Sequence, residues 1–240
     1  MKFEEVLRGR NSVRDFTDQP VSDTLLESLL EQALCAPSST NTQAYRVAIA
    51  QGEVKNRLAA KLCSTFDKAI EVQKLKGPMK VIKGLSSGAL PKGDFKIDMS
   101  YPPELKKRAI ECGKGLYGLL NIERHDRVGR DAWMRRNFEF FDAPVEIFLF
   151  VHGDRPTHSA LDAGMFFQNL MLAAKAAGLG TCAQASVAMW SKTVRSFFEI
   201  EEGYKLICGM ALGYPSGAEV NRYQPSKRSV KELCLPVRPL

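Results

Sequence analysis

The most apolar stretch of the chain, residues 160–177, limits the possible folds more than any other feature. Its length approaches that of a membrane-spanning helix, but four polar residues interrupt it: Asp162, Gln168, Asn169 and Lys175. Polar groups are costly inside a bilayer and Gly178 ends the stretch, so a membrane partner is not expected. A helix that is apolar nearly all round is buried on all sides. We therefore expect a central core helix that also packs against a second subunit.

Short β-type runs and helical patterns alternate along the rest of the chain. The apolar runs predict strands over residues 45–50, 145–151 and 205–212. Helical periodicity predicts helices over residues 1–9, 23–35, 54–73, 104–140 and 189–199. Turn signals leave residues 76–103 irregular, and the tail 216–240 has little periodicity of its own. Strands separated by helices predict an α+β (α/β layered) architecture in one domain, residues 1–240.

Composition narrows the functional classes. The net charge of +7 favours anionic partners without choosing among phosphates, carboxylates and nucleic acid. Residues 106–136 are dense in Lys and Arg but carry no recognised nucleic-acid-binding signature, so no nucleic-acid partner is expected. The six cysteines form no Cys-x-x-Cys pair and the three histidines do not cluster near them, so no metal site is expected. Scattered cysteines and an acidic, polar start indicate a cytoplasmic protein with free thiols.

A basic cluster follows the first predicted helix. Arg10, Ser12 and Arg14 alternate, so in an extended segment they would project to one side. Cations and a hydroxyl arranged in this way suit a phosphate group. A solvated basic turn before a helix accounts for the same residues. Lys227 and Arg228 in the tail allow the same two interpretations.

Two further segments have the composition of a ligand site. Residues 37–43, Pro-Ser-Ser-Thr-Asn-Thr-Gln, can hydrogen-bond a flat heterocycle, although such loops commonly just end a helix. Residues 178–186, Gly-Leu-Gly-Thr-Cys-Ala-Gln-Ala-Ser, lack bulky side chains, which lets another molecule approach the backbone. A tight turn with buried small residues explains that segment equally well.

The order and spacing of these segments resemble the nitroreductase family. The shared features are an Arg-x-Ser-x-Arg start, a Pro-Ser-Ser-x-Asn-x-Gln loop, a Gly-Leu-Gly turn after a long apolar helix, and a late Gly-Tyr-Pro…Asn-Arg…Arg tail. In this chain the last comprises 213–215, Asn221-Arg222 and Arg228. Residues 136–144 resemble the subgroup of nitrobenzoate-type reductases. The likeness covers nearly the whole chain and is weakest over about residues 64–103.

The resemblance implies an FMN-dependent α+β fold unlike flavodoxin, with a central antiparallel-type sheet flanked by helices. It also implies an intertwined homodimer with FMN at the subunit interface. The phosphate and ribityl chain would contact Arg10, Asn11, Ser12, Arg14, Lys227 and Arg228. The other subunit would contribute Pro37, Ser38, Ser39 and Asn41. The flavin ring would lie against Ala183, Gln184, Ala185 and Ser186, where many relatives have Pro and Glu in place of the two alanines.

The implied activity is an NAD(P)H oxidoreductase that reduces nitroaromatic or related flat acceptors by a ping-pong hydride mechanism. FMN would carry the chemistry, so no catalytic side chain is required. Alternatives are a quinone or ene reductase, a reductive dehalogenase, and a non-catalytic flavin-binding protein. Residues 64–140 would form a lid that selects the acceptor, with five candidate contacts: Tyr117, Arg124, Trp133, Arg136 and Phe140. A surface helix with core-facing aromatics accounts for the same residues. The absence of a Gly-x-Gly-x-x-Gly fingerprint leaves NADH and NADPH equally open.

Overall fold

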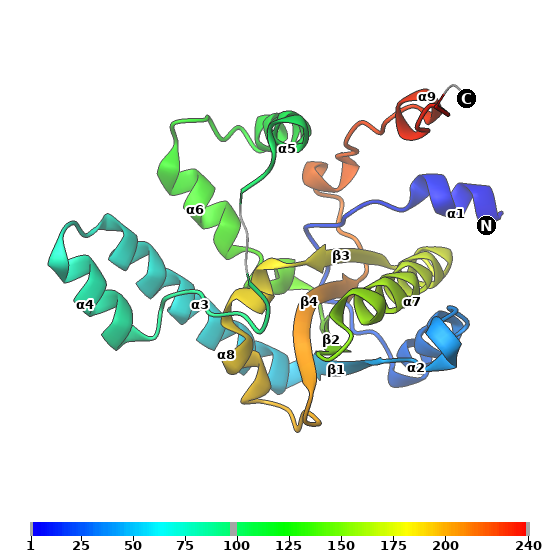
Figure 1. The fold of residues 1–240 in the computed structure, drawn as a ribbon, viewed down its shortest axis with the longest axis horizontal. Coiled ribbons are helices and arrows are strands. Elements are labelled where there is room, and N and C mark those ends of the chain that lie inside the picture. The colour runs from blue at the N-terminus through cyan, green and yellow to red at the C-terminus, as the bar shows by residue number, and fades with distance from the viewer. Residues whose placement is uncertain (1, 97–99, 239–240) are drawn as a thin grey trace.

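A four-stranded antiparallel sheet forms the centre of the molecule (Figure 1). The computed structural model describes residues 2–96 and 100–238. The strand order is β1-β2-β4-β3, and the strands span Tyr45–Gln51 (β1), Val145–His152 (β2), Gly180–Gln184 (β3) and Tyr204–Gly213 (β4). The expected α+β fold with an antiparallel-type sheet is confirmed.

Helices pack on both faces of this sheet and project from it. In chain order they are α1 (Phe3–Gly9), α2 (Asp23–Leu34), α3 (Gly52–Lys74), α4 (Pro78–Ser87), α5 (Pro103–Leu119), α6 (Arg127–Arg135), α7 (Pro156–Ala176), α8 (Ser191–Arg195) and α9 (Val230–Leu233). Short 3₁₀ turns are η1 (Ser39–Asn41), η2 (Phe140–Asp142), η3 (Ser186–Trp190) and η4 (Glu219–Arg222). In Figure 1, α3 and α4 reach out at one end, while both termini lie at the other.

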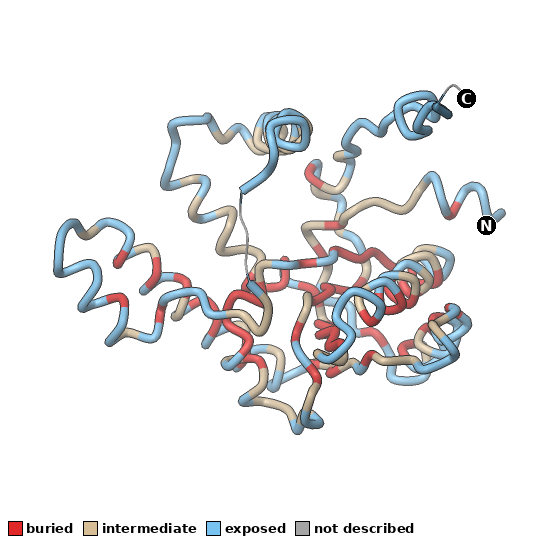
Figure 2. Tube along the Cα trace, in the orientation of Figure 1, coloured by how far each residue is buried: buried red, intermediate tan, exposed pale blue. Residues whose placement is uncertain are grey.

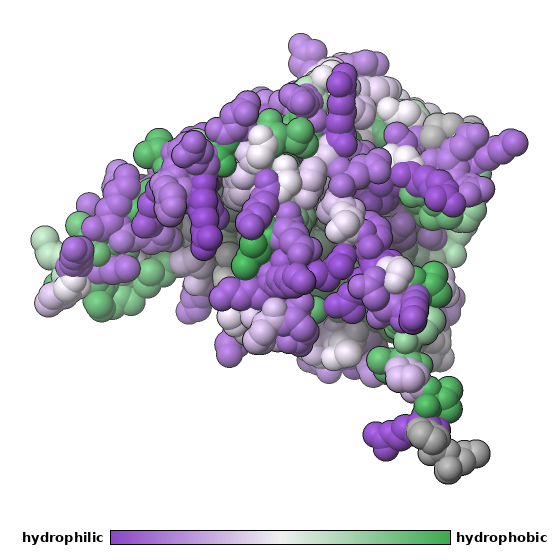
Figure 3. All heavy atoms as spheres, turned by 90° about the horizontal axis from the view of Figure 1, so that it is seen from above, coloured by the Kyte–Doolittle hydropathy of each residue, from purple (hydrophilic) through white to green (hydrophobic). Residues whose placement is uncertain are grey.

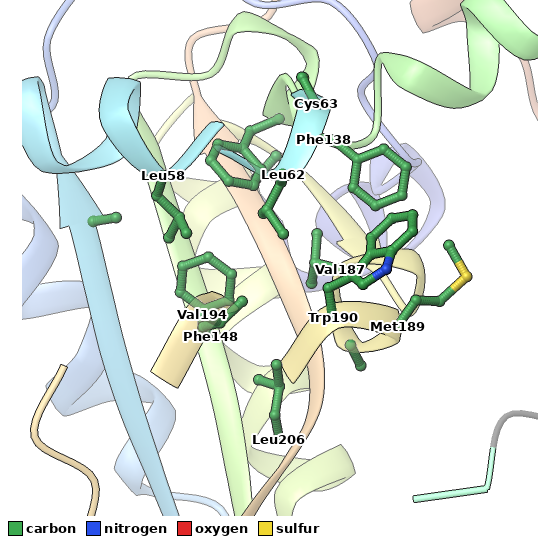
Figure 4. Close-up of a cluster of buried hydrophobic side chains, with 14 of the residues drawn as sticks. Leu58, Leu62, Cys63, Phe138, Phe148, Val187, Met189, Trp190, Val194 and Leu206 are labelled. Atoms are coloured by element: carbon green, nitrogen blue, oxygen red, sulfur yellow. The ribbon is translucent and has the colours of Figure 1, made fainter. Parts of the chain in front are cut away.

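Strand β2 is buried on both faces, which explains its uninterrupted apolar sequence. Val145, Ile147, Leu149 and Val151 pack on one side with residues of α2 and α7. Phe148 and Phe150 pack on the other side with α3, η3 and α8. Figure 4 shows part of this second core, and Figure 2 shows that buried residues concentrate around the sheet. The sheet is therefore the middle layer of three.

Helix α7 lies along one face of the sheet but keeps an open stripe. Phe166, Phe167 and Leu170 are buried against the sheet and α2. Leu161 is 64% exposed, and Gly164 and Gln168 are exposed on the same side of the helix. The expectation of burial on all sides is thus wrong for a single chain, because no part of residues 2–96 or 100–238 covers the stripe. In the part of the chain that is described, no helix is long and apolar enough to cross a membrane.

Several local expectations need correction. Helix α4 forms within residues 76–103, which the turn signals left irregular; residues 97–99 of that segment lie outside the described part. The helix expected over 104–140 divides into α5 and α6, and the one expected over 189–199 is η3 followed by the short α8. Strand β3 occupies residues treated only as a turn.

Two projecting parts expose apolar side chains. On α4 these include Met79, Ile82 and Leu85, and in the tail they include Val230 and Leu235. Figure 3 shows apolar residues at the projecting α4 end on an otherwise largely hydrophilic face. The compact three-layer body therefore leaves apolar surface at both its extremities.

Candidate functional site

The segment after α1, residues 10–16, is attached to the edge of the sheet beside β3. Ser12 forms a parallel bridge with Thr181, and the Val13 N–H donates to the Thr181 carbonyl at 3.0 Å. The side chain of Val13 is buried in the core. Because successive side chains of an extended segment point to opposite sides, burial of Val13 turns Ser12 and Arg14 the other way. The sequence-predicted alternation of Arg10, Ser12 and Arg14 is therefore realised against a strand.

Asn221, in η4, holds this segment in place. Its Oδ1 accepts a hydrogen bond from the Arg14 N–H at 2.8 Å, and its Nδ2 donates to the Asp15 carbonyl at 2.7 Å. The Asn11 amide donates in turn to the Asn221 carbonyl. Sequence reasoning placed Asn221 in the tail motif but gave it no role. The residue type is the signal that could have indicated this role, because an Asn amide can accept from a backbone N–H and donate to a backbone carbonyl at once.

The cations singled out from the sequence lack the close ion pairs that other arginines have. Arg136 pairs with Asp142 at 2.8 Å and Arg195 with Asp94 at 3.3 Å. Within residues 2–96 and 100–238, by contrast, no ion pair is found for Arg10, Lys227 or Arg228. The Arg14 guanidinium donates to the Ser12 carbonyl at 3.3 Å and to no other group in the described part of the chain. Cations left without counter-charges suit a bound anion.

The charges of two of these arginines act on Cys182 in β3. Burial raises the pKa of the Cys182 thiol to about 11, while the positive charges of Arg14 and Arg10 oppose that shift. Successive side chains along the strand point to opposite faces, so Cys182 and Gln184 are buried while Ala183 and Ala185 are exposed. The exposed methyl groups of Ala183 and Ala185 form a low, uncrowded surface that a flat ligand can approach.

The segment 183–186 also contains polar atoms that lack partners. Gln184 donates from Nε2 to the Asn137 carbonyl at 2.6 Å, which ties β3 to the residues after α6. Among the described residues, its Oε1 and the Ser186 Oγ are buried without a hydrogen bond. Buried polar groups in native proteins are normally satisfied. Gln184 Oε1 and Ser186 Oγ are therefore unused hydrogen-bonding atoms in this segment.

Glu146 lies directly beneath this segment and was not singled out from the sequence. It is fully buried on β2, and neither carboxyl oxygen accepts a well-formed hydrogen bond from the described residues. Its Oε1 fills the space where a side chain on Gly209 would stand, and Gly209 pairs with Gln184. Burial raises the pKa of Glu146 well above its ordinary value, while Lys55 and the Met210 N–H oppose the shift.

The polar loop, residues 37–43, lies at a different place in the same chain. The Ser39 N–H donates to Asp162 Oδ2 at 3.1 Å, near the start of α7. Thr40, Asn41 and Gln43 have left-handed φ values of 52°, 55° and 45°, which cost of order 1–3 kcal/mol each. Arg10 adjoins the other end of α7 beside Lys175, and thirteen helical steps lead from Asp162 to Lys175, about 20 Å. Within one chain, Pro37, Ser38, Ser39 and Asn41 do not meet the cations.

The tail carries Lys227 and Arg228 beside α5. Arg108 Nη2 donates to the Ser226 carbonyl at 3.0 Å, and the Tyr223 hydroxyl donates to the Cys112 carbonyl at 2.7 Å. A cavity of about 470 Å³ lies between α5 and the tail, and Arg228 lines it. The tail is thus held against α5, with Arg228 at the cavity between them.

The predicted lid residues divide into two groups. Tyr117 and Arg124 line a groove of about 890 Å³ on α5 and α6. Phe140 is fully buried in the core, Trp133 packs against Phe141 at 5.9 Å, and Arg136 is held by carboxylates. Core packing or ion pairs thus already engage the side chains of these three residues.

Known proteins resemble this chain over almost its whole length. The sequence model of the nitroreductase family matches residues 7–214. A 4-nitrobenzoate reductase from Pseudomonas putida is 30% identical over 231 residues, covering 96% of this chain and 92% of that protein. A nitrobenzene nitroreductase from Ectopseudomonas oleovorans is 29% identical, covering 96% and 95%. The crystal structure of the FMN-dependent nitroreductase NfnB from Mycobacterium smegmatis in complex with NADPH superposes with a TM-score of 0.83 at 26% identity, covering 98% and 97%.

Proposed function

The chain belongs to the nitroreductase family, and from this premise we propose that it is an FMN-dependent NAD(P)H oxidoreductase. Its acceptors are nitroaromatic or related flat compounds, reduced in a ping-pong reaction. Two enzymes that it resembles are named for nitrobenzoate and nitrobenzene, and one similar structure contains NADPH. Both the nicotinamide and the aromatic acceptor are flat, so one open surface can receive them in turn.

The observation that carries this proposal is a set of cations without counter-charges beside exposed small residues. Arg10 and Arg14 supply positive charge for the FMN phosphate, and Ser12 supplies a hydroxyl between them. Ala183 and Ala185 leave the face of β3 open to the ring. When bound, FMN supplies the hydride chemistry. The residues of the chain bind it, orient it and keep positive charge nearby, which favours an anionic ligand in any redox state.

We further propose that two chains form the complete site. The polar loop lies about 20 Å from Lys175 and Arg10 along α7, so a second copy must bring Pro37, Ser38, Ser39 and Asn41 to the cations. The open stripe at Leu161, Gly164 and Gln168 offers a contact surface for that copy. Light scattering coupled to gel filtration tests this directly: a mass of one chain at micromolar concentration would exclude it.

Residues 64–140 contribute the surface that selects the acceptor. In the groove on α5 and α6, the Arg130 guanidinium stacks over Tyr117 at 5.0 Å, and Lys114 and Arg124 add positive charge. Aromatic and cationic groups together favour flat acceptors with a negative substituent. We propose that this groove, rather than Trp133 or Phe140, forms the lid over the ring.

An absorbance spectrum of the purified protein is the first test. We expect flavin bands that bleach when NADH or NADPH is added without oxygen, and that return when a nitroaromatic acceptor is added. Nitroaromatics, quinones, activated alkenes and halogenated aromatics are then compared as acceptors. Bleaching that no acceptor reverses would indicate a flavin-binding protein without this activity. A colourless protein that excess FMN does not reconstitute would refute the proposal.

Replacing two of the unpaired cations tests the phosphate contacts. Arg10→Ala with Arg228→Ala should yield protein largely free of FMN. Because a bound ligand at a hundred times its Kd stabilises the native state by about 2.7 kcal/mol, the melting temperature should fall as well. Arg57→Ala with Lys68→Ala removes the same charge from the exposed face of α3 and is the matched control. Equal FMN content in the two double variants would contradict the assignment.

A further inference from the structure

Lys175, in the last turn of α7, lies against the start of the segment that carries Arg10. If Gly9 had a β-carbon, it would stand 3.0 Å from Lys175 Cε and 3.7 Å from Nζ. The absence of a side chain at Gly9 therefore makes room for the lysine. Arg10 follows directly, so the two cations come from elements far apart in sequence and meet at the C-terminal end of α7.

Both cations line one small cavity of about 150 Å³. The other polar residues that line it are Asn11, Thr181 and Asn221, and no carboxylate of the described residues lines it. Among the described residues, Lys175 has neither a hydrogen bond nor an ion pair from its side chain. Two like charges that share a cavity repel each other, and a bound anion would convert that repulsion into attraction.

A purely structural role for Lys175 is the alternative. A cation in the last turn of a helix interacts favourably with the helix dipole, and Lys175 occupies that position on α7. This role explains the charge of Lys175. It does not explain why the ammonium shares a cavity with a second unpaired cation.

We propose that Lys175 is a phosphate-binding residue of the flavin site and acts together with Arg10. This inference rests on the proposed function, because it takes the phosphate of FMN as the anion. Arg10 and Lys175 would approach the phosphate from two elements, the extended segment and the end of α7. Thr181 would add a hydroxyl donor, while the amide groups of Asn11 and Asn221 are already used in fixing the segment.

Comparing FMN with riboflavin isolates the phosphate, since riboflavin has the same ring and ribityl chain without it. The dissociation constants of both are measured by fluorescence quenching in wild type, Lys175→Met and Lys175→Arg. Lys175→Gln is a second neutral variant if Lys175→Met does not fold, and Lys68→Met is the control for loss of an exposed helix cation. We expect Lys175→Met to raise the dissociation constant for FMN about tenfold or more, as the loss of a charge-assisted hydrogen bond does. Riboflavin binding should be unchanged, and Lys175→Arg should restore most of the FMN affinity.

Each other outcome has a definite meaning. Unchanged FMN affinity in Lys175→Met, or equal weakening of FMN and riboflavin, would overturn the inference and leave the helix-dipole role. In both cases wild type would still bind FMN, so the proposed function would stand. A wild-type protein that binds neither compound would overturn the proposed function and this inference with it.

Discussion

Glu146→Gln tests how the sheet holds a carboxyl group at its centre. The groups that face Glu146 are Lys55 from α3, Cys182 on β3 and Cys208 on β4. Lys55 Nζ donates to the Ala143 carbonyl at 3.0 Å rather than to the carboxylate. Burial therefore dominates, and it raises the pKa of Glu146 well above its ordinary value of 4.5.

The direction of the pH effect follows from proton binding. Above pH 4.5 the unfolded chain releases the Glu146 proton while the native protein keeps it. The stabilisation of the native state by the neutral carboxyl is therefore complete below pH 4.5, and it is lost as the pH rises toward the pKa of Glu146 in the native protein. In that window the free energy of unfolding falls by about 1.4 kcal/mol per pH unit. Glutamine does not titrate, so the free energy of unfolding of Glu146→Gln should rise relative to that of wild type by about 1.4 kcal/mol per pH unit.

Thermal unfolding followed by circular dichroism between pH 5 and 8, with excess FMN and constant ionic strength, measures the difference. For a chain of 240 residues the slope corresponds to a melting-temperature gap that widens by about 3–6 °C per pH unit. Glu71→Gln, on the exposed face of α3, shows what loss of a surface carboxylate does. Parallel wild-type and Glu146→Gln curves, or a gap that narrows as the pH rises, would refute the reasoning.

Two further substitutions test the attachment of residues 10–16 to β3. Asn221→Ala removes the hydrogen bonds to Arg14 and Asp15. We expect the free energy of unfolding, measured with denaturant, to fall by about 2 kcal/mol, and we expect FMN to be released on ultrafiltration. Unchanged FMN retention would contradict this expectation. A β-carbon at Gly180 would stand 2.5 Å from Val13 Cγ2, so Gly180→Ala should cost about 1–3 kcal/mol and lower FMN content. Gly118→Ala, which meets open space on α5, is its control, and equal stability of the two variants would refute the clash.

The strands that the sequence predicted are those whose own side chains require burial. Residues 145–151 and 205–212 are apolar runs, and each forms a strand within the sheet. Strand β3, Gly-Thr-Cys-Ala-Gln, has almost no β-branched or aromatic residues. It is a strand because β4 pairs with it on one side and Ser12 and Val13 lie along the other. Such tertiary pairing leaves no trace in local propensity.

Helix α4 was missed because the same residues serve two purposes. Gly77-Pro78 and Gly88 are turn signals within residues 76–103, yet Pro at the first helical position and a left-handed Gly at the end are also typical helix boundaries. Gly88 has φ 64°, which a glycine adopts without strain. The ten residues between them are long enough for a helix, and only the packing of α4 against α3 decides between the two meanings.

The site could be predicted as a set of segments but not as a single place. Spacing along the chain identified Arg10, Ser12 and Arg14, and the structure brings them to β3. The spacing along the chain could not identify Lys175, because the proximity of Lys175 to Gly9 depends on how α7 packs. Nor could it separate Tyr117, which lines a groove, from Phe140, which is buried. Aromatic residues at helical spacing look alike until the core is formed.

The geometry of α7 links the divided site to the proposed dimer. The polar loop adjoins the N-terminal half of α7 through Asp162, and Arg10 adjoins its C-terminal end beside Lys175. Two copies related by a twofold axis through the open stripe near Gly164 and Gln168 would place their α7 helices antiparallel. The N-terminal half of one helix would then lie beside the C-terminal end of the other, which brings each loop toward the partner's cations. The same operation covers Leu161, so one contact would both bury the stripe and complete two sites.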